Sequence, residues 1–433
     1  MRRLGPYRLY LILESGTSFL IGITSATIMV YWVLSGRLNP LELLLLGTAL
    51  ELSYFVFQLP TGVLADLVSR RMCVLAGLFI VGLALVMQGV SASFANLIGA
   101  QVVLGFGAAL NGGAEEAWIA DELADADMSG VYLRATQLGL VGTIAGSLLS
   151  GVIALAGLNV PLIAGGSGIC LFSCLLAFVM PERNFQRRQA SALAALADQT
   201  RAARRAIVAV PGLALLFGMT MFVGLWGESF DRLWGAFLLR DIRFPHGLRP
   251  VIWFSLFACA VAVLSLGSTE IAKRRTQRLG AAWVADALLV LTLAIGIGVI
   301  VMATARGFAV AVAAYLVISV LRPVFDPLID GWMVTRIEPS VRATALSARE
   351  MFDSGGQIIG GPVIGVIGTL TSIRIALMAG AAALVPAAGC LVAASRRIRP
   401  RFRAVSEASA ADLGAVEAGA GLAGAAGAEP EVV

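Results

Sequence analysis

The sequence is poor in charged residues. They make up 14% of the chain, whereas ordinary globular proteins carry about 25%. Hydrophobic residues reach 58%, and the mean hydropathy is +0.87. A water-soluble fold cannot cover so much apolar surface. The composition therefore excludes a soluble globular protein and predicts a protein immersed in a lipid bilayer.

Histidine and cysteine are also scarce. His246 is the single histidine, and the five cysteines all fall within apolar stretches (Cys73, Cys170, Cys174, Cys259 and Cys390). Their spacing matches no metal-ligand pattern, so we expect no metal, no cofactor and no structural disulfide. The chain has neither an HExxH sequence nor a nucleophile elbow, which argues against an intramembrane hydrolase. We do not expect an enzyme.

What the chain has instead is about twelve apolar stretches of roughly 20 residues, the length that crosses a bilayer as a helix. Their residues run continuously instead of alternating with polar ones, which favours helices over barrel strands. The first stretch follows a basic N-terminus, as in a signal peptide, but it contains Glu14 and lacks a small-residue cleavage site, so we expect it to be retained. The expected spans are 9–34, 41–64, 72–91, 95–119, 131–156, 160–180, 211–239, 250–270, 280–303, 308–335, 343–368 and 373–394.

The basic residues are distributed unequally between the two sides of these spans. With both termini inside, 23 of the 32 Lys and Arg residues lie in inner segments and six in outer gaps. Basic residues near a span tend to stay cytoplasmic, so this asymmetry predicts cytoplasmic termini. Lys273 is the only lysine, and this arginine bias is typical of a high-GC bacterial genome. We expect a multi-pass protein of the bacterial inner membrane that binds no nucleic acid.

The chain divides into two halves at an arginine-rich segment. Residues 1–180 and 209–396 each hold six spans, residues 181–208 are expected to be a cytoplasmic linker with an interfacial helix, and residues 397–433 a disordered cytoplasmic tail. A faint repeat supports the division, because Glu14-Ser15 recurs as Glu228-Ser229 at the same place in the second half. This pattern is typical of a transporter built by duplication. The fold class predicted is all-α, with twelve transmembrane helices in two six-helix bundles.

The loop after the second span carries a recognisable motif. Residues 62–71 read GVLADLVSRR, which resembles the signature loop of the major facilitator superfamily, with Ser69 where glycine is usual. We expect Gly62 to allow close approach of neighbouring helices. The resemblance implies that Asp66 meets the N-terminus of the eleventh span. It also implies that Arg70, next to Arg71, pairs with an acid after the fourth span, where Asp121 and Glu122 are available, and that these contacts latch the inner gate.

At two positions the sequence differs from the pattern of proton-coupled members of that superfamily. Drug/proton antiporters of that superfamily often carry an arginine in the fourth span and a Gly-Pro pair in the fifth, where this chain has Gln101 and Gly146-Ser147. Proton coupling would therefore depend on carboxylates alone.

Four acids within spans have no obvious partner, and they are the candidates for proton coupling. A charge at mid-bilayer costs about 2.5–3.5 kcal/mol on insertion scales, so each needs a partner, water or a function. Adjacent helical residues point about 100° apart, so only one of Glu115 and Glu116 is expected to face a cavity fully. Hydrogen bonding to a neighbouring helix is an equally good interpretation of each acid. The candidates are Glu14, Glu51, Glu115 and Glu116.

Other intramembrane charges are spaced four residues apart and are expected to form ion pairs along single helices. Three groups of cavity or ion-pair candidates result: Glu228, Asp231 and Arg232; Arg322, Asp326 and Asp330; Arg349 and Asp353.

The sequence thus predicts a secondary transporter that exports small amphiphilic compounds in exchange for protons by alternating access. An importer, a facilitator or a lipid flippase of the same fold remains an alternative, and a non-transporting receptor is disfavoured because no sensing domain is appended. The expected partners are a small-molecule substrate, the proton and the lipid bilayer, with the protein acting as a monomer. An acidic cavity favours cationic or amphiphilic cargo over anions.

Overall fold

The computed structural model describes residues 5–123, 128–185, 201, 212–279, 283–334, 337 and 342–397. Within these residues the regular structure is helical. The first half contains α1 (Pro6–Leu34), α2 (Pro40–Leu67), α3 (Arg70–Val90), α4 (Phe94–Asn111), α5 (Ala114–Glu122), α6 (Met128–Ile153) and α7 (Val160–Val179). The second half contains α9 (Leu213–Asp241), α10 (Pro250–Leu279), α11 (Val284–Thr304), α12 (Phe308–Leu321), the 3₁₀ helix η2 (Arg322–Val324), α13 (Phe325–Val334), α14 (Arg342–Leu370) and α15 (Ile373–Ala382).

Eleven helical segments of the described chain are long and apolar enough to cross a membrane. The one predicted span that is missing from these eleven, 343–368, corresponds to α14, which has 29 residues but many glycines and several charges. The fold therefore agrees with the predicted all-α arrangement of twelve membrane helices. Most of the predicted linker and the tail after residue 397 lie outside the described residues, so the interfacial helix and the disordered tail stay predictions.

Local sequence signals set several helix ends. Asn39 and Glu42 form a reciprocal capping box at the start of α2, and Pro40 occupies the first helical position, where its missing N–H costs nothing. Ser69 and Ser372 cap α3 and α15 by accepting a hydrogen bond from a first-turn amide. These caps allow short connections between successive spans.

Two spans that we expected to be continuous are each interrupted. The fourth is divided into α4 and α5 at Gly112 and Gly113, and Gly113 has a φ of 73°, which favours glycine. The tenth is divided at Arg322 and Pro323, where the chain tightens into η2 because proline lacks the N–H that an α-helix needs. The single helices predicted over 95–119 and 308–335 are therefore wrong in detail.

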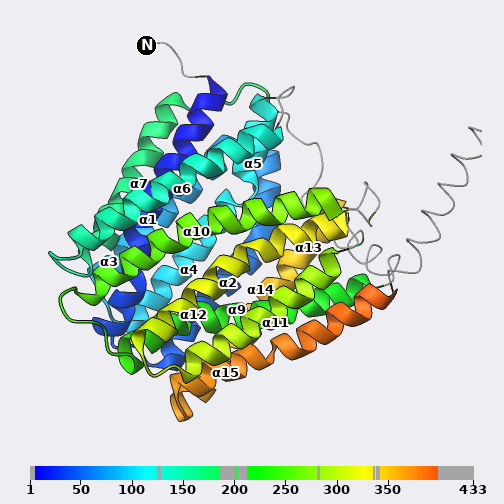
Figure 1. Cartoon of the computed structure of the whole chain (residues 1–433). Coiled ribbons are helices and arrows are strands. Elements are labelled where there is room, and N and C mark those ends of the chain that lie inside the picture. The colour runs from blue at the N-terminus through cyan, green and yellow to red at the C-terminus, as the bar shows by residue number, and fades with distance from the viewer. Residues whose placement is uncertain are drawn as a thin grey trace, which may run out of the picture.

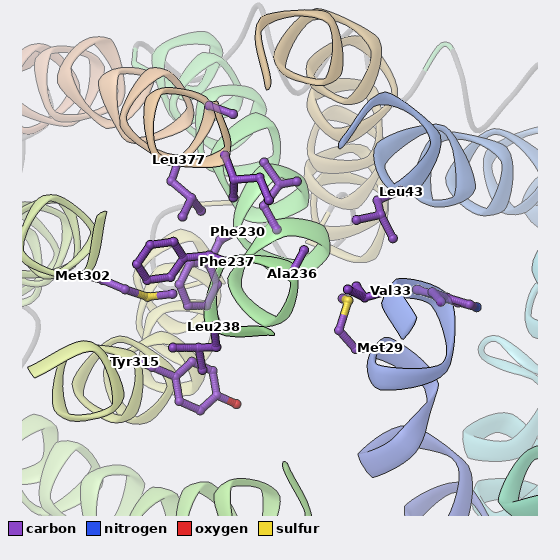
Figure 2. Packing of buried hydrophobic residues seen from close by; sticks show 14 of the residues in the cluster. Met29, Val33, Leu43, Phe230, Ala236, Phe237, Leu238, Met302, Tyr315 and Leu377 are labelled. Atoms are coloured by element: carbon purple, nitrogen blue, oxygen red, sulfur yellow. The ribbon is translucent and has the colours of Figure 1, made fainter. Parts of the chain in front are cut away.

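Packing differs at the two ends of the bundle. At one end, which carries Leu38 and Ser93, a single hydrophobic cluster combines α1 and α2 with α9, α10, α11, α12, α14 and α15. Figure 2 shows Met29 and Val33 of α1 and Leu43 of α2 facing α9 of the other half. We call this the joined end.

The opposite end, which carries Pro6 and Arg70, has two separate clusters. One lies within residues 9–180 and the other within residues 213–394. In Figure 1, α1, α6 and α7 run toward the N-terminus at the top, whereas α11 and α15 run to the right, so the helices diverge from a shared end at the lower left. We call the diverging side the split end.

Candidate transport site

The signature loop places Arg70 between two acids at the split end. Its guanidinium lies 3.1 Å from Asp66 and 2.5 Å from Asp121 at the end of α5, and it also donates to the Ala117 carbonyl. Of the two acids offered by the sequence, Asp121 is therefore the partner of Arg70. The gating role of these residues stays a prediction. The predicted contact of Asp66 with the start of the eleventh span involves the segment before α14, part of which lies outside the described residues.

Gly62 does not behave as expected. A side-chain carbon added there would meet no heavy atom of the described residues within 4 Å, so Gly62 permits no close approach of the described helices in this conformation. The expectation was wrong because a sequence motif gives the identity of a residue and not the distance to the neighbouring helix. At the split end that distance is set by the divergence of the helices.

Glu182 was missed by the sequence analysis. It accepts hydrogen bonds from the Ser69 hydroxyl at 2.6 Å and from the Arg71 amide at 3.0 Å. Glu122 in turn accepts from the amide of Arg183. These bonds attach residues 181–184, where the predicted linker begins, to the signature loop. The one available signal was Ser69 itself, a hydroxyl where the motif usually has glycine.

Three of the coupling candidates of the first half lie on α1 and α5. Glu115 accepts a hydrogen bond from Asn111 at 3.4 Å, and its second carboxylate oxygen is buried without a hydrogen-bond partner among the described residues. Glu116 is exposed, whereas Glu14 is half-buried. The charge of Glu115 interacts with those of both other acids. The structure thus gathers Glu14, Glu115 and Glu116, and it distinguishes the partly buried Glu115 from the exposed Glu116.

Glu51 lies where the two halves meet. It belongs to α2, and its carboxylate accepts a hydrogen bond of 3.1 Å from the Ser354 hydroxyl of α14. One turn away, Gly47 faces the ion pair between Glu228 and Arg232 of α9, whose charged atoms are 3.1 Å apart as the spacing predicted. The bond from Ser354 connects an acid of one half directly to the other half.

The remaining ion pairs join different helices, contrary to the predicted pairing along single helices. Arg322 pairs with Asp231 of α9. Arg349 of α14 pairs with Asp326 at 3.0 Å and with Asp330 at 2.7 Å, both on α13. The prediction failed for Arg322 because four-residue spacing considers one helix only. Asp231 of α9 lies within ion-pair distance of Arg322, and a 3₁₀ turn over residues 322–324 interrupts the expected helix.

Asp353 was expected to pair with Arg349 but accepts a hydrogen bond of 2.8 Å from Gln357. It lines a cavity of about 60 Å³ inside the second half, together with Arg322, Asp326, Thr292 and Gln357. Such a cavity has room for roughly four water molecules. It is too small for a whole drug-like molecule, because ligand pockets usually measure about 300–1,000 Å³.

Comparison with known protein families shows which family the chain belongs to. The family model described as Major Facilitator Superfamily matches residues 15–321. The chain belongs to the Major Facilitator Superfamily. It is accordingly a multi-pass secondary transporter, and the resemblance inferred from the signature loop is confirmed.

Solved structures of superfamily transporters share the fold. The nucleoside transporter NupG is 16% identical, with a TM-score of 0.72, over 90% of this chain and 98% of that one. A bacterial homologue of the human lysosomal transporter Spinster, in an inward-facing and unoccupied conformation, is 18% identical, with a TM-score of 0.73, over 92% and 98%. A peptide transporter POT in complex with sulfate is 14% identical, with a TM-score of 0.71, over 91% and 95%. No curated protein matches the chain in sequence. At these identities the structural likeness shows the fold and leaves the cargo open.

Proposed function

We propose that this superfamily member exports small amphiphilic cations from bacteria in exchange for protons. Its two halves, residues 1–180 and 209–396, would alternately expose a central site to the two sides of the membrane. The joined end supports two such halves, since one hydrophobic cluster holds them together there while each half keeps its own cluster at the split end.

The unequal distribution of basic residues supports an orientation in the inner membrane with both termini cytoplasmic. The split end, which carries the N-terminal end of α1, would then face the cytoplasm. This orientation makes the conformation inward-facing, as needed to load cargo from the cell interior.

The observation that carries proton coupling is the position of Glu51 between the halves. In this conformation Glu51 is held by Ser354 of the opposite half, and its charge interacts with Glu228 and Arg232. When the joined end opens, α2 must separate from α9 and α14, so Glu51 exchanges these partners for water. Burial, hydrogen bonds and nearby charges each change how readily a carboxyl group binds a proton. Glu51 therefore has different environments in the two states, as coupling requires.

The charge of the site supports a cationic cargo. The first half gathers three acids at α1 and α5, and Arg322 and Arg349 of the second half already have acid partners. An excess of acids attracts cations and repels anions.

Flux measurements in proteoliposomes test this function. With ethidium as the probe cation and an imposed pH gradient, we expect uphill movement that a protonophore abolishes. The substitution that removes the coupling carboxyl should abolish uphill movement and leave downhill exchange. We would compare Glu51→Gln, Glu14→Gln, Glu115→Gln and Glu116→Gln, with the exposed Glu270→Gln on α10 as the matched control. Uphill movement that survives all four changes would eliminate carboxylate coupling and favour a facilitator or an importer.

A further inference from the structure

Asp353 is an intramembrane acid that forms no ion pair with the described arginines. Arg349, its expected partner, is engaged by Asp326 and Asp330, and Arg322 is engaged by Asp231. The hydrogen bond that Asp353 accepts comes from the neutral amide of Gln357. A partly buried intramembrane carboxylate is costly when the described residues supply no ion-pair partner for it, so this position calls for a function.

One turn of α14 connects Asp353 to Glu51. Ser354 follows Asp353 directly and donates its hydroxyl to Glu51 on α2. Consecutive residues of a helix point about 100° apart, so the two side chains serve different neighbours. Asp353 faces α9, where a carbon added to Gly224 would lie 3.0 Å from a carboxylate oxygen of Asp353. The turn therefore carries a hydroxyl toward one half and an acid into the other.

The cavity in the second half provides a polar environment on the side of Asp353. Its lining includes Asp353, Arg322, Asp326, Thr292 and Gln357, and its volume of about 60 Å³ is enough for several waters. The charged groups whose fields reach Asp353 are Arg322 and Asp326 from η2 and α13, Arg349 from α14 itself, and Glu51 from α2. Gly224 of α9, Thr292 of α11 and Leu384, just after α15, also line the cavity and carry no charge.

We propose that Asp353 is a second proton-binding group of this transporter and that it receives the coupling proton from Glu51 while α2 and α14 are in contact. The inference rests on the proposed proton coupling and adds a proton acceptor and a route. In the present conformation Ser354 donates its hydroxyl to Glu51; for the transfer this bond reverses, so that protonated Glu51 donates to the Ser354 oxygen and the Ser354 hydroxyl turns toward water. The proton then leaves a carboxyl oxygen of Glu51 and binds the Ser354 oxygen. Ser354 releases its own hydroxyl proton, which reaches a carboxylate oxygen of Asp353 through water. Glu51 becomes a carboxylate, Asp353 becomes a carboxylic acid, and the total charge is unchanged.

The geometry gives this transfer a direction. Glu51 belongs to the first half, whereas Ser354 and Asp353 belong to the second. Opening the joined end separates α2 from α14 and breaks the Glu51–Ser354 hydrogen bond, so a proton taken up by Glu51 in the open state is delivered only after closure. Asp353 lines the cavity of the second half, whose volume allows water to take up the proton there.

The test measures proton flux and cargo flux separately in proteoliposomes, with a pH-sensitive dye in the lumen and ethidium as the cargo probe. We expect Asp353→Asn to lower cargo-driven proton flux about a hundredfold, the low end for a positioned acid–base group, while downhill ethidium exchange continues. Asp353→Glu should recover part of the proton flux. The control Glu270→Gln should match the wild-type protein in both fluxes.

The outcomes separate this inference from the proposed function. If the wild-type protein moves no protons with ethidium, the proposed coupling itself fails. If the wild-type protein moves protons and Asp353→Asn moves them equally well, the role of Asp353 is overturned and coupling at Glu51 stands. If Asp353→Asn also loses downhill ethidium exchange, its proton flux cannot be interpreted. The relay is then tested by comparing the proton flux of Ser354→Ala, which lacks the hydroxyl, with that of Ser354→Thr, which keeps it. We expect slowed proton flux only in the alanine variant, and equal flux in both would refute the relay.

Discussion

Closure of the joined end depends on the absence of a side chain at Gly47. A carbon added there would overlap a carboxylate oxygen of Glu228 and would lie 2.5 Å from the Arg232 Nε atom. Non-bonded carbon atoms prefer separations of about 3.5–4.0 Å. The ion pair has little freedom to move away, because Arg232 also lies over the Trp32 ring, with its guanidinium carbon 5.6 Å from the ring centroid. In Gly47→Ala, the Glu228 and Arg232 side chains or α2 itself must therefore shift, and Glu228 has little room because it is buried.

The size and sign of this effect follow from the contact. Adding a methyl group to a packed site costs about 1–3 kcal/mol, and a differential of that size shifts a two-state equilibrium about 5- to 150-fold. Alanine favours the helix over glycine by about 0.5–1 kcal/mol in both states, so helix propensity does not oppose the shift. We expect Gly47→Ala to move the population away from the conformation described above and toward one open at the joined end.

Spin labels at Ser93→Cys and Arg306→Cys, in a background without the native cysteines, place one probe on each half near the joined end. Double electron–electron resonance should show a larger fraction of long distances in Gly47→Ala. Gly99→Ala is the matched control, because a carbon added at Gly99 would meet nothing within 4 Å. An unchanged distance distribution in Gly47→Ala would refute the argument that this glycine permits closure.

Three further predictions concern the split end and the topology. Asp66→Asn should lower the transport rate severalfold with unchanged abundance, because an acid beside Arg70 is lost; wild-type rates in a flux assay would contradict the gating role. A cysteine at Gln189 should resist an impermeant maleimide added to whole cells, whereas one in 240–249 should react; labelling at Gln189 would overturn the orientation. Glu182→Gln should lower the melting temperature modestly, since two hydrogen bonds to a charged acceptor contribute about 1.5–3 kcal/mol each at most; an unchanged melting curve would show that this attachment adds no stability.

Much of the fold could be predicted because each span is a local feature of the sequence. Continuous apolar runs gave the spans, and the pair Glu228 and Arg232 was found because both residues share one turn of one uninterrupted helix. Arg70 and Asp121 were matched through the resemblance of the signature loop to a known family.

The features that were missed depend on where separate helices meet. Ser354 and Glu51 are 303 residues apart in the sequence, and Glu182 is 113 residues from Ser69, so helical spacing carries no information about either contact. Asp353 was assigned to Arg349 because four-residue spacing considers one helix only, whereas the acids of α13 approach Arg349 more closely. Gly62 was misread because the space around a glycine depends on the conformation of the whole bundle.

The composition of α14 has a consequence for how the protein is made. Its glycines lie where the helix meets its neighbours: Gly356 packs against Met221 and Leu225 of α9, and Gly365 packs against Leu41 of α2. A segment with so few large apolar residues partitions weakly into hydrocarbon by itself, since the gain grows with the apolar area it removes from water. Both of its packing partners are synthesised earlier in the chain. Integration of α14 during biosynthesis therefore depends on α2 and α9 already standing in the bilayer, and a truncated chain lacking them should leave this segment outside the membrane.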